Sequence, residues 1–228
     1  MKKKILVFMM LIVSVFSLSA CGKSKINLAD YLIEERTTLF TAYDEVYSST
    51  LSSGLREKDY NFNGVVDTKV DFAILTLSRK DNQPLANDTY TFIVNINGTP
   101  HTGFLTKNET NNSYSTDLGI KVNPTDEVNV QISFTGYTFN QDLTNTSNSF
   151  NVDSSTALSI ANKELAEELK NIVSDKNVKI EAVMKILKDN SNLETESYYW
   201  YVGVISTNGE TLGILINANT GDIIAKKV

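Results

Sequence analysis

Hydrophobic and polar residues alternate along much of the chain, a period-two pattern that predicts β-strands. The clearest run is Val128–Phe134, which is apolar at even positions and polar at odd ones, as expected for a half-buried antiparallel strand. Residues 70–77 also read as a strand, with 70, 72, 74 and 76 on one face and 71, 73, 75 and 77 on the other. Residues 90–96 alternate again, and Asn97-Gly98 follows them as a turn signal. Several short strands with Gly and Asn between them predict an all-β sandwich from about residue 65 to residue 152.

Residues 22–60 have a weaker pattern. Thr, Tyr, Phe and Val are concentrated between Thr37 and Val46, which favours strands, although a helix also fits these residues. We therefore assign residues 31–152 to one β-sandwich-like domain. In its strand pattern this region is similar to bacterial immunoglobulin-like modules.

The period becomes helical after Asp153, whose side chain, like the two serines that follow it, can accept hydrogen bonds from the first turn of a helix. Apolar residues then recur three or four positions apart, at Leu158, Ala161, Leu165, Leu169 and Ile172. Alternating runs at 178–187, 198–205, 212–216 and 223–225 predict four antiparallel strands, with turns at 208–209 and 219–222. The expected unit is an α+β domain over residues 153–228, with the helix covering one face of a four-stranded sheet.

The N-terminus carries a secretory signal rather than a folded element. Three lysines at positions 2–4 precede an apolar run at 5–16, which is too short for a comfortable membrane span. The residues Leu18-Ser19-Ala20-Cys21 resemble the lipobox of bacterial lipoproteins, in which the cysteine is acylated and becomes the new N-terminus. The resemblance predicts a signal peptide at 1–20, lipid attachment at Cys21, a tether at 21–30, and a protein anchored on the extracytoplasmic face of the cell membrane.

Three segments of residues 154–228 resemble the PepSY domain. They are the helix opening at 155–161, the aromatic strand Tyr199-Trp200-Tyr201-Val202, and the closing run 214–224, which reads ILINANTGDII. Asn217 stands where the family usually has Asp. The resemblance implies a fold in which a helix packs on four antiparallel strands. It also implies a non-catalytic module that restrains peptidases or acts locally at the cell surface.

Charge and composition narrow the range of partners. Loss of residues 1–20 removes three lysines and no acid, which lowers the formal charge from −6 by three, to −9. So acidic a chain disfavours nucleic acid as a partner through any broad basic surface. No enzyme activity is expected, because Cys21 is the only cysteine, His101 the only histidine, and no nucleophile-elbow, zinc-protease or phosphate-loop motif occurs. We therefore predict no catalytic, cofactor-binding or metal-binding residues, and interpret His101 as an exposed loop residue.

The stretch Asp59-Tyr60-Asn61-Phe62-Asn63-Gly64-Val65-Val66-Asp67 allows two interpretations. Asp59, Asn61, Asn63 and Asp67 fit positions 1, 3, 5 and 9 of a calcium-binding loop, with Gly64 at position 6. Position 12, which should be an acid, is Val70, and the residues that follow read as a strand. A hairpin with Asn63-Gly64 at its turn is therefore the favoured interpretation, and calcium binding the alternative.

The predicted function is that of an interaction protein. It would be held at the membrane by Cys21 and would bind or restrain a peptidase or another envelope partner, and a ligand- or calcium-binding lipoprotein is the alternative. The aromatic strand supplies one candidate surface. Tyr198 and Trp200 share one face of this strand, and Tyr199 and Tyr201 share the other. One of the two faces should pack under the helix, and the other should face either the β-domain or a partner.

Overall fold

The computed structural model describes residues 26–59, 61–189 and 197–228. In these ranges twelve strands form one sheet, accompanied by two α-helices and two short 3₁₀ helices, η1 and η2. The strands are β1 (Leu32–Tyr43), β2 (Tyr47–Glu57), β3 (Lys69–Arg79), β4 (Tyr90–Ile96), β5 (Thr99–Lys107), β6 (Ser113–Asp117), β7 (Val128–Phe134), β8 (Tyr137–Asn145), β9 (Ile180–Lys188), β10 (Tyr198–Ser206), β11 (Thr211–Asn217) and β12 (Ile223–Lys227). The helices are η1 (Leu28–Tyr31), η2 (Thr146–Ser149), α2 (Ser154–Glu164) and α3 (Ala166–Ile172).

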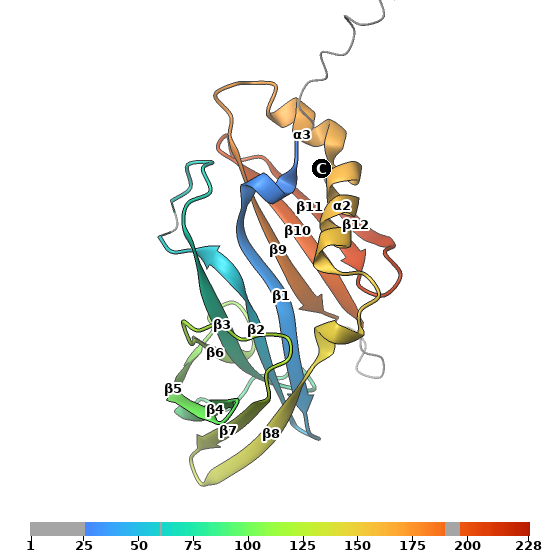
Figure 1. Cartoon of the computed structure of the whole chain (residues 1–228). Coiled ribbons are helices and arrows are strands. Elements are labelled where there is room, and N and C mark those ends of the chain that lie inside the picture. The colour runs from blue at the N-terminus through green and yellow to red at the C-terminus, as the bar shows by residue number, and fades with distance from the viewer. Residues whose placement is uncertain (1–25, 60, 190–196) are drawn as a thin grey trace, which may run out of the picture.

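Within the described ranges, the first eight strands close into an antiparallel barrel (Figure 1). Their order is β1-β2-β3-β6-β5-β4-β7-β8, and β8 returns to β1. Two of the strand pairs in the barrel are short. Only Phe40 and Thr41 of β1 pair with the end of β8, and only Thr106 and Lys107 of β5 pair with β6. The barrel is therefore held mainly by long hairpins and closed by a few backbone pairs.

The barrel interior is filled by the apolar positions of the alternating strands. Val128, Val130 and Ile132 point inward from β7, as the alternation predicts. Their neighbours in this core include Phe40, Leu51, Leu75, Leu77, Tyr90, Val94 and Leu143. The Asn97-Gly98 turn joins β4 to β5, and both residues have positive φ, 50° and 81°, as a two-residue hairpin turn requires.

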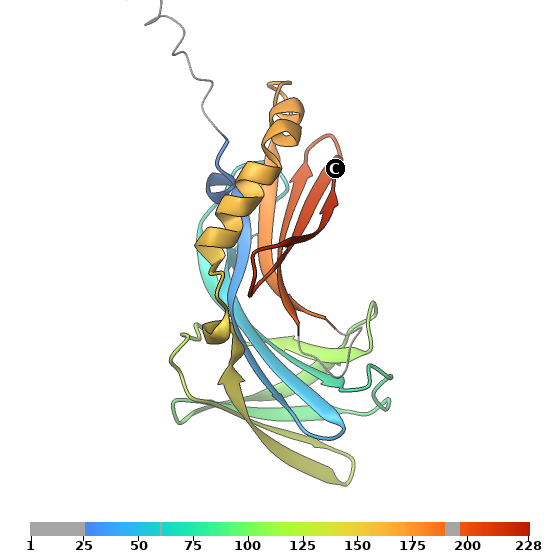
Figure 2. The ribbon, with the colours of Figure 1, turned by 90° about the vertical axis from the view of Figure 1, so that its right-hand side faces the viewer.

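The C-terminal part adds β9–β12 to the sheet, and α2 and α3 cover one face of these strands (Figure 2). Asp153 caps α2, its carboxylate accepting a 2.7 Å hydrogen bond from the Thr156 N–H. The predicted helix face is confirmed, because Ala161, Leu165, Leu169 and Ile172 are buried in the same core as Trp200. Leu158 is partly buried against that core.

Strand β1 belongs to both parts of the molecule. Its N-terminal half pairs in parallel with β9, from Leu32↔Ala182 to Arg36↔Lys185, and its C-terminal half pairs with β8 from Phe40 onward. Strand β1 also pairs with β2, from Glu34 to Tyr43. Strands β8 and β9 therefore diverge on the same side of β1, between Arg36 and Phe40, and η2 lies at this fork.

The expected fold class is wrong. The first part is a closed barrel rather than a sandwich, because β8 returns to β1. The last four strands with their helices are not a separate α+β domain of the PepSY kind, because β9 is hydrogen-bonded to β1 in the same sheet. Alternation is the same in a sandwich strand and a barrel strand, and it does not specify the partner. Both deciding contacts involve β1, the segment whose sequence pattern was weakest.

The local elements agree better with the sequence. The helix and the four C-terminal strands occur where the periodicity placed them, and residues 32–57 form strands rather than a helix. The closing turn is stabilised by Asn217, whose side-chain oxygen accepts the N–H groups of Asn219 and Thr220. Asn217 therefore caps this turn through a carbonyl oxygen, without a charge.

Candidate functional site

A polar groove of about 350 Å³ lies at the fork, where the end of β9 stands over the outer face of the barrel. Strands β1, β2 and β3 form its floor, and β9 and the segments around residues 80 and 112 form its walls. Its hydroxyl side chains are Thr41, Ser48, Thr50, Ser52, Thr76, Ser78 and Ser113; its cations are Arg36, Arg79, Lys80 and Lys188. The remaining side chains are those of Asn82, Asn111, Asn112, Asp189, Leu39, Ile186 and Leu187.

The floor is made of hydroxyl groups in rows across the strands. Thr41 faces Thr50, and Thr50 faces Thr76 in the next strand. A second row pairs Ser48 with Ser78. Residues that face each other across antiparallel strands share one face of the sheet, about 4.8 Å apart. Because the apolar residues of β1–β3 point into the barrel, their alternate polar residues line the groove.

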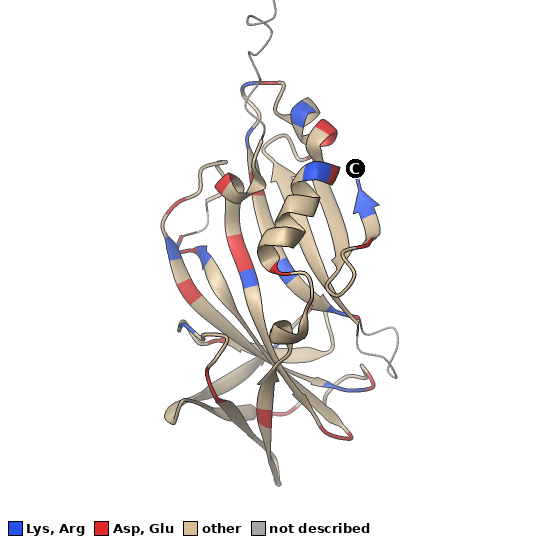
Figure 3. Cartoon of the chain, turned by 45° about the vertical axis from the view of Figure 1, so that its right-hand side comes forward, with Lys and Arg blue, Asp and Glu red and all other residues tan. Residues whose placement is uncertain are grey.

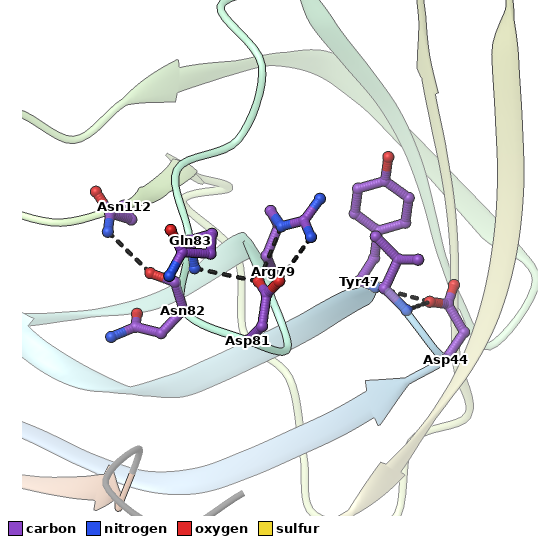
Figure 4. A network of polar contacts seen from close by, with 8 residues as sticks. Asp44, Tyr47, Arg79, Asp81, Asn82, Gln83 and Asn112 are labelled. Carbon is purple, nitrogen blue, oxygen red and sulfur yellow. Dashed lines mark hydrogen bonds and ion pairs between the residues drawn. The ribbon is translucent and has the colours of Figure 1, made fainter.

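Arg79 and its turn form one preorganised wall of the groove (Figure 4). The Arg79 guanidinium donates two hydrogen bonds to the Asp81 carboxylate, Nε to Oδ1 at 2.9 Å and Nη2 to Oδ2 at 2.6 Å. These bonds lower the pKa of Asp81 from 3.8 to about 2. The Asp81 carboxylate also accepts the Gln83 N–H, and the Asn112 side chain donates to the Asn82 carbonyl at 2.9 Å. The wall therefore has a defined shape without a ligand.

Two lysines meet at the ring of Tyr43, at the end of β1. The Lys80 ammonium lies 5.2 Å from the ring centroid and the Lys188 ammonium 5.0 Å, both within the range of cation–π attraction. Tyr43 is 47% exposed. It faces Ser48 across the strands, and therefore lies on the same face as the floor of the groove.

Arg36 closes the other end of the groove. Its guanidinium donates to Glu34 at 2.7 Å and lies 5.5 Å from the ring of buried Phe72. Lys185 of β9 pairs with Arg36 of β1, and its ammonium lies 5.5 Å from the centroid of the Tyr201 ring. Burial lowers the pKa of Lys185, and the positive charge of Arg36 lowers it further. The surface beyond this end of the groove is therefore aromatic and cationic.

The predicted site residues lie elsewhere. Cys21 is outside the described residues. His101 lies half-buried in strand β5 rather than in an exposed loop, so that interpretation is wrong. The face of Tyr199 and Tyr201 is half-buried, with the Tyr199 hydroxyl 3.3 Å from Asp189.

The calcium-like stretch forms the loop between β2 and β3. Asn63 and Gly64 stand at its turn, Gly64 with φ of +68°, and both backbone N–H groups donate to Oε1 of Glu181 at 2.8 Å. The Asn63 and Asp67 side chains accept hydrogen bonds from nearby backbone N–H groups. Over the described residues, no group of three or more His, Cys, Asp or Glu side chains is placed to hold a metal ion. Strands β2 and β3 pair with each other on either side of this loop, up to Glu57↔Lys69, so the two strands form a hairpin whose connection is longer than the two-residue turn expected.

Sequence reasoning did not identify the groove. The signal was present in the run Tyr47-Ser48-Ser49-Thr50-Leu51-Ser52-Ser53, in which small polar residues occupy both faces of one strand. On its own such a run indicates a solvated strand. Only the register with β1 and β3 aligns its hydroxyls into rows, and only β9 turns that face into a groove.

The chain matches no protein-family model, no curated protein and no solved structure. In the part of the chain that the structure describes, no helix is long and apolar enough to cross a membrane. Lys and Arg positions alternate with Asp and Glu positions along the ribbon in Figure 3. The interpretation of the site therefore depends on the groove itself.

Proposed function

We propose that this protein is a lipid-anchored, non-catalytic binding protein of the extracytoplasmic face, and that the groove binds a polar envelope partner. The observation that carries the proposal is the lining: rows of hydroxyls, three amides and four cations around a preformed concave surface. Such groups orient and hold a ligand through many hydrogen bonds. A peptidase is the partner that the sequence resemblance implies, and a segment of its surface is one polar occupant of this kind.

The position of the groove suits such a role. If Cys21 is acylated, the five peptide steps from Cys21 to Ile26 span at most about 18 Å, so η1 stays near the membrane surface. Strand β1 then leads from Leu32 to Thr41, a distance of about 30 Å at ~3.3 Å per residue. The groove lies at this far end of β1 and would face the envelope rather than the lipid.

The anchor is tested by Cys21→Ser. Loss of the acyl chains should release the full chain from the membrane fraction, since each buried methylene contributes ~0.8 kcal/mol to membrane affinity. Retention of the variant in membranes would contradict the anchor.

The groove is tested by filling it. Thr50→Trp places a large side chain on the groove floor, and Thr102→Trp places the same side chain at an exposed position of β5. The test uses the unanchored Cys21→Ser chain, so that the lipid does not itself cause sedimentation; with isolated cell envelopes this chain and its Thr102→Trp variant should bind, with a loss of about tenfold or more for Thr50→Trp. Circular dichroism and thermal unfolding establish that both variants are folded. If folded Thr50→Trp sediments like the unanchored chain without it, the groove is not the binding site.

A further inference from the structure

The groove is more positive than the chain that forms it. The whole sequence has a formal charge of −6, yet among the described residues the groove lining holds four cations and one carboxylate, Asp189. Arg36 and Arg79 share their charge with the carboxylates of Glu34 and Asp81. The Lys80 ammonium instead lies over the aromatic ring of Tyr43, and a neutral ring does not cancel its positive charge. A cation-rich concavity in an acidic protein is a local feature that selects a negatively charged group.

The ring of Tyr43 adds a flat apolar platform beside these cations. Lys80 comes to this ring from the end of β3 and Lys188 from the end of β9, so one aromatic surface gathers cations from two sides of the fork. An exposed tyrosine ring can pack against the apolar face of a cyclic ligand while neighbouring ammonium groups bind an acidic substituent. The same end of the groove thus offers both stacking and charge.

The side chains of the groove floor can form hydrogen bonds with hydroxyl groups of a ligand. Thr41, Thr50 and Thr76 present one hydroxyl per strand, about 4.8 Å apart. Each hydroxyl donates one hydrogen bond and accepts others, so the row can bind a ligand that is itself a series of hydroxyls. Thr41 already exchanges a 2.6 Å hydrogen bond with Thr146 at the fork, which fixes one end of the row.

We propose that the groove binds an anionic polyol, a sugar or sugar-alcohol chain carrying phosphate or carboxylate groups. Its acid group would lie at Lys80, its ring or carbon chain on Tyr43, and its hydroxyls along the threonine row. This inference rests on the proposed function and names the class of ligand for the same groove. Single-stranded DNA shares the charge but is disfavoured, because it lacks the series of hydroxyls that the threonine row complements.

Calorimetry on the full chain in detergent tests the ligand class with four probes of equal length. They are a glycerol-phosphate oligomer, an oligogalacturonate, a neutral oligosaccharide and a single-stranded oligonucleotide. One or both of the first two should bind at least about tenfold more tightly than the neutral one, and their affinity should fall several-fold between about 50 and about 200 mM salt. The phosphate and carboxylate arms identify which acid group the groove prefers.

Variants locate the binding. Lys80→Glu should weaken the anionic probe about tenfold or more, whereas Lys176→Glu, the same change in the exposed turn after α3, should have little effect. Thr50→Val keeps the size of the side chain and removes a hydroxyl. It should weaken binding several-fold without altering the salt dependence.

The outcomes separate the two proposals. If the neutral and acidic probes bind equally well and Thr50→Trp abolishes both, the groove is a binding site but its ligand is not anionic. Tighter binding of the oligonucleotide would also overturn the anionic-polyol inference. If the anionic probes do not bind and Thr50→Trp still loses envelope binding, this inference fails alone. If Thr50→Trp changes neither measurement, both proposals fail.

Discussion

The buried carboxylate of Glu181 binds the tip of the loop between β2 and β3, and removing it gives a sharp prediction. Glu181 of β9 is 2% exposed, and its Oε1 accepts the N–H groups of both Asn63 and Gly64 at 2.8 Å. The loop spans residues 58–68, so this carboxylate connects a barrel hairpin to the C-terminal strands. Substitution of Glu181 by alanine should free the loop and destabilise the fold.

The magnitude follows from the two hydrogen bonds and their surroundings. A hydrogen bond to a charged group contributes about 1.5–3 kcal/mol, which would give about 3–6 kcal/mol for two. The freed N–H groups of the exposed loop can bond to water, which offsets part of this loss. The second oxygen of Glu181 is buried with no hydrogen-bond partner, so the carboxylate already carries a desolvation penalty. We therefore expect Glu181→Ala to lower the free energy of unfolding by about 2 kcal/mol.

Urea unfolding of the full chain in detergent measures this change, and a drop of about 4–8 °C in Tm should accompany it. Hydrogen exchange localises the effect, because the amides of Asn63 and Gly64 should lose protection while the β7 amides keep theirs. Glu181→Gln separates charge from shape, since the amide keeps one acceptor oxygen, and it should lose about half as much. The control is Glu109→Gln, which changes an exposed glutamate of a barrel loop.

Two results would refute the reasoning. Unchanged unfolding of Glu181→Ala with unchanged exchange at Asn63 and Gly64 would mean that the carboxylate does not hold the loop. Equal loss of stability in Glu181→Gln and Glu109→Gln would mean that the effect comes from net charge rather than from the contact.

Three further predictions concern single contacts. The pKa of Asp81 in the folded state, about 2, is below its ordinary 3.8, so the Arg79 pair should contribute stability above about pH 4 and lose it as the pH falls through about 2; carboxyl NMR titration that finds an ordinary pKa would disprove it. Gly54→Ala should destabilise by about 3 kcal/mol in urea unfolding, because a Cβ would lie 1.8 Å from a backbone carbonyl oxygen of β1; an unchanged midpoint would show that the two strands separate easily. Trp200→Phe removes the 2.8 Å hydrogen bond from the indole N–H to the Val152 carbonyl and should lower the free energy of unfolding by about 2–3 kcal/mol, which thermal unfolding would detect; a loss no larger than that of an exposed aromatic such as Tyr137→Phe would contradict it.

How much the sequence could predict depended on whether a feature was local. The apolar spacing of residues 158–172 fixed the helix face, and the alternation of Val128–Phe134 fixed which side chains enter the core. Neither pattern shows which strand lies next to which in the sheet. The closure of the barrel depends on Phe40 facing Asn145, residues more than a hundred positions apart. The parallel contact of β1 with β9 spans a still longer separation.

The candidate site was beyond the sequence for the same reason. Thr41, Thr50 and Thr76 come from three strands, and nothing in any one strand marks its threonine as part of a row. The calcium-like loop was the opposite case, a compact local pattern that resembled a site. The structure shows that its Gly64 serves a turn whose N–H groups bind a carboxylate of the same chain. Here the compact local pattern belongs to a structural contact. The groove is instead formed by residues of several strands, none of which has a distinctive pattern of its own.

The fork in β1 explains why the groove is where it is. Strand β9 follows β1 only as far as Arg36, and β8 joins β1 only at Phe40 and Thr41, so the end of β9 separates from β1 while it stays paired with β10, and it stands over the outer barrel wall. Ile186 and Lys188 lie beyond the last β1 contact of β9 and become one wall of the groove. The floor belongs to the barrel and this wall to the C-terminal strands, so neither part contains the site alone. Ligand sites commonly form where two structural units meet, and here the two units share a single strand.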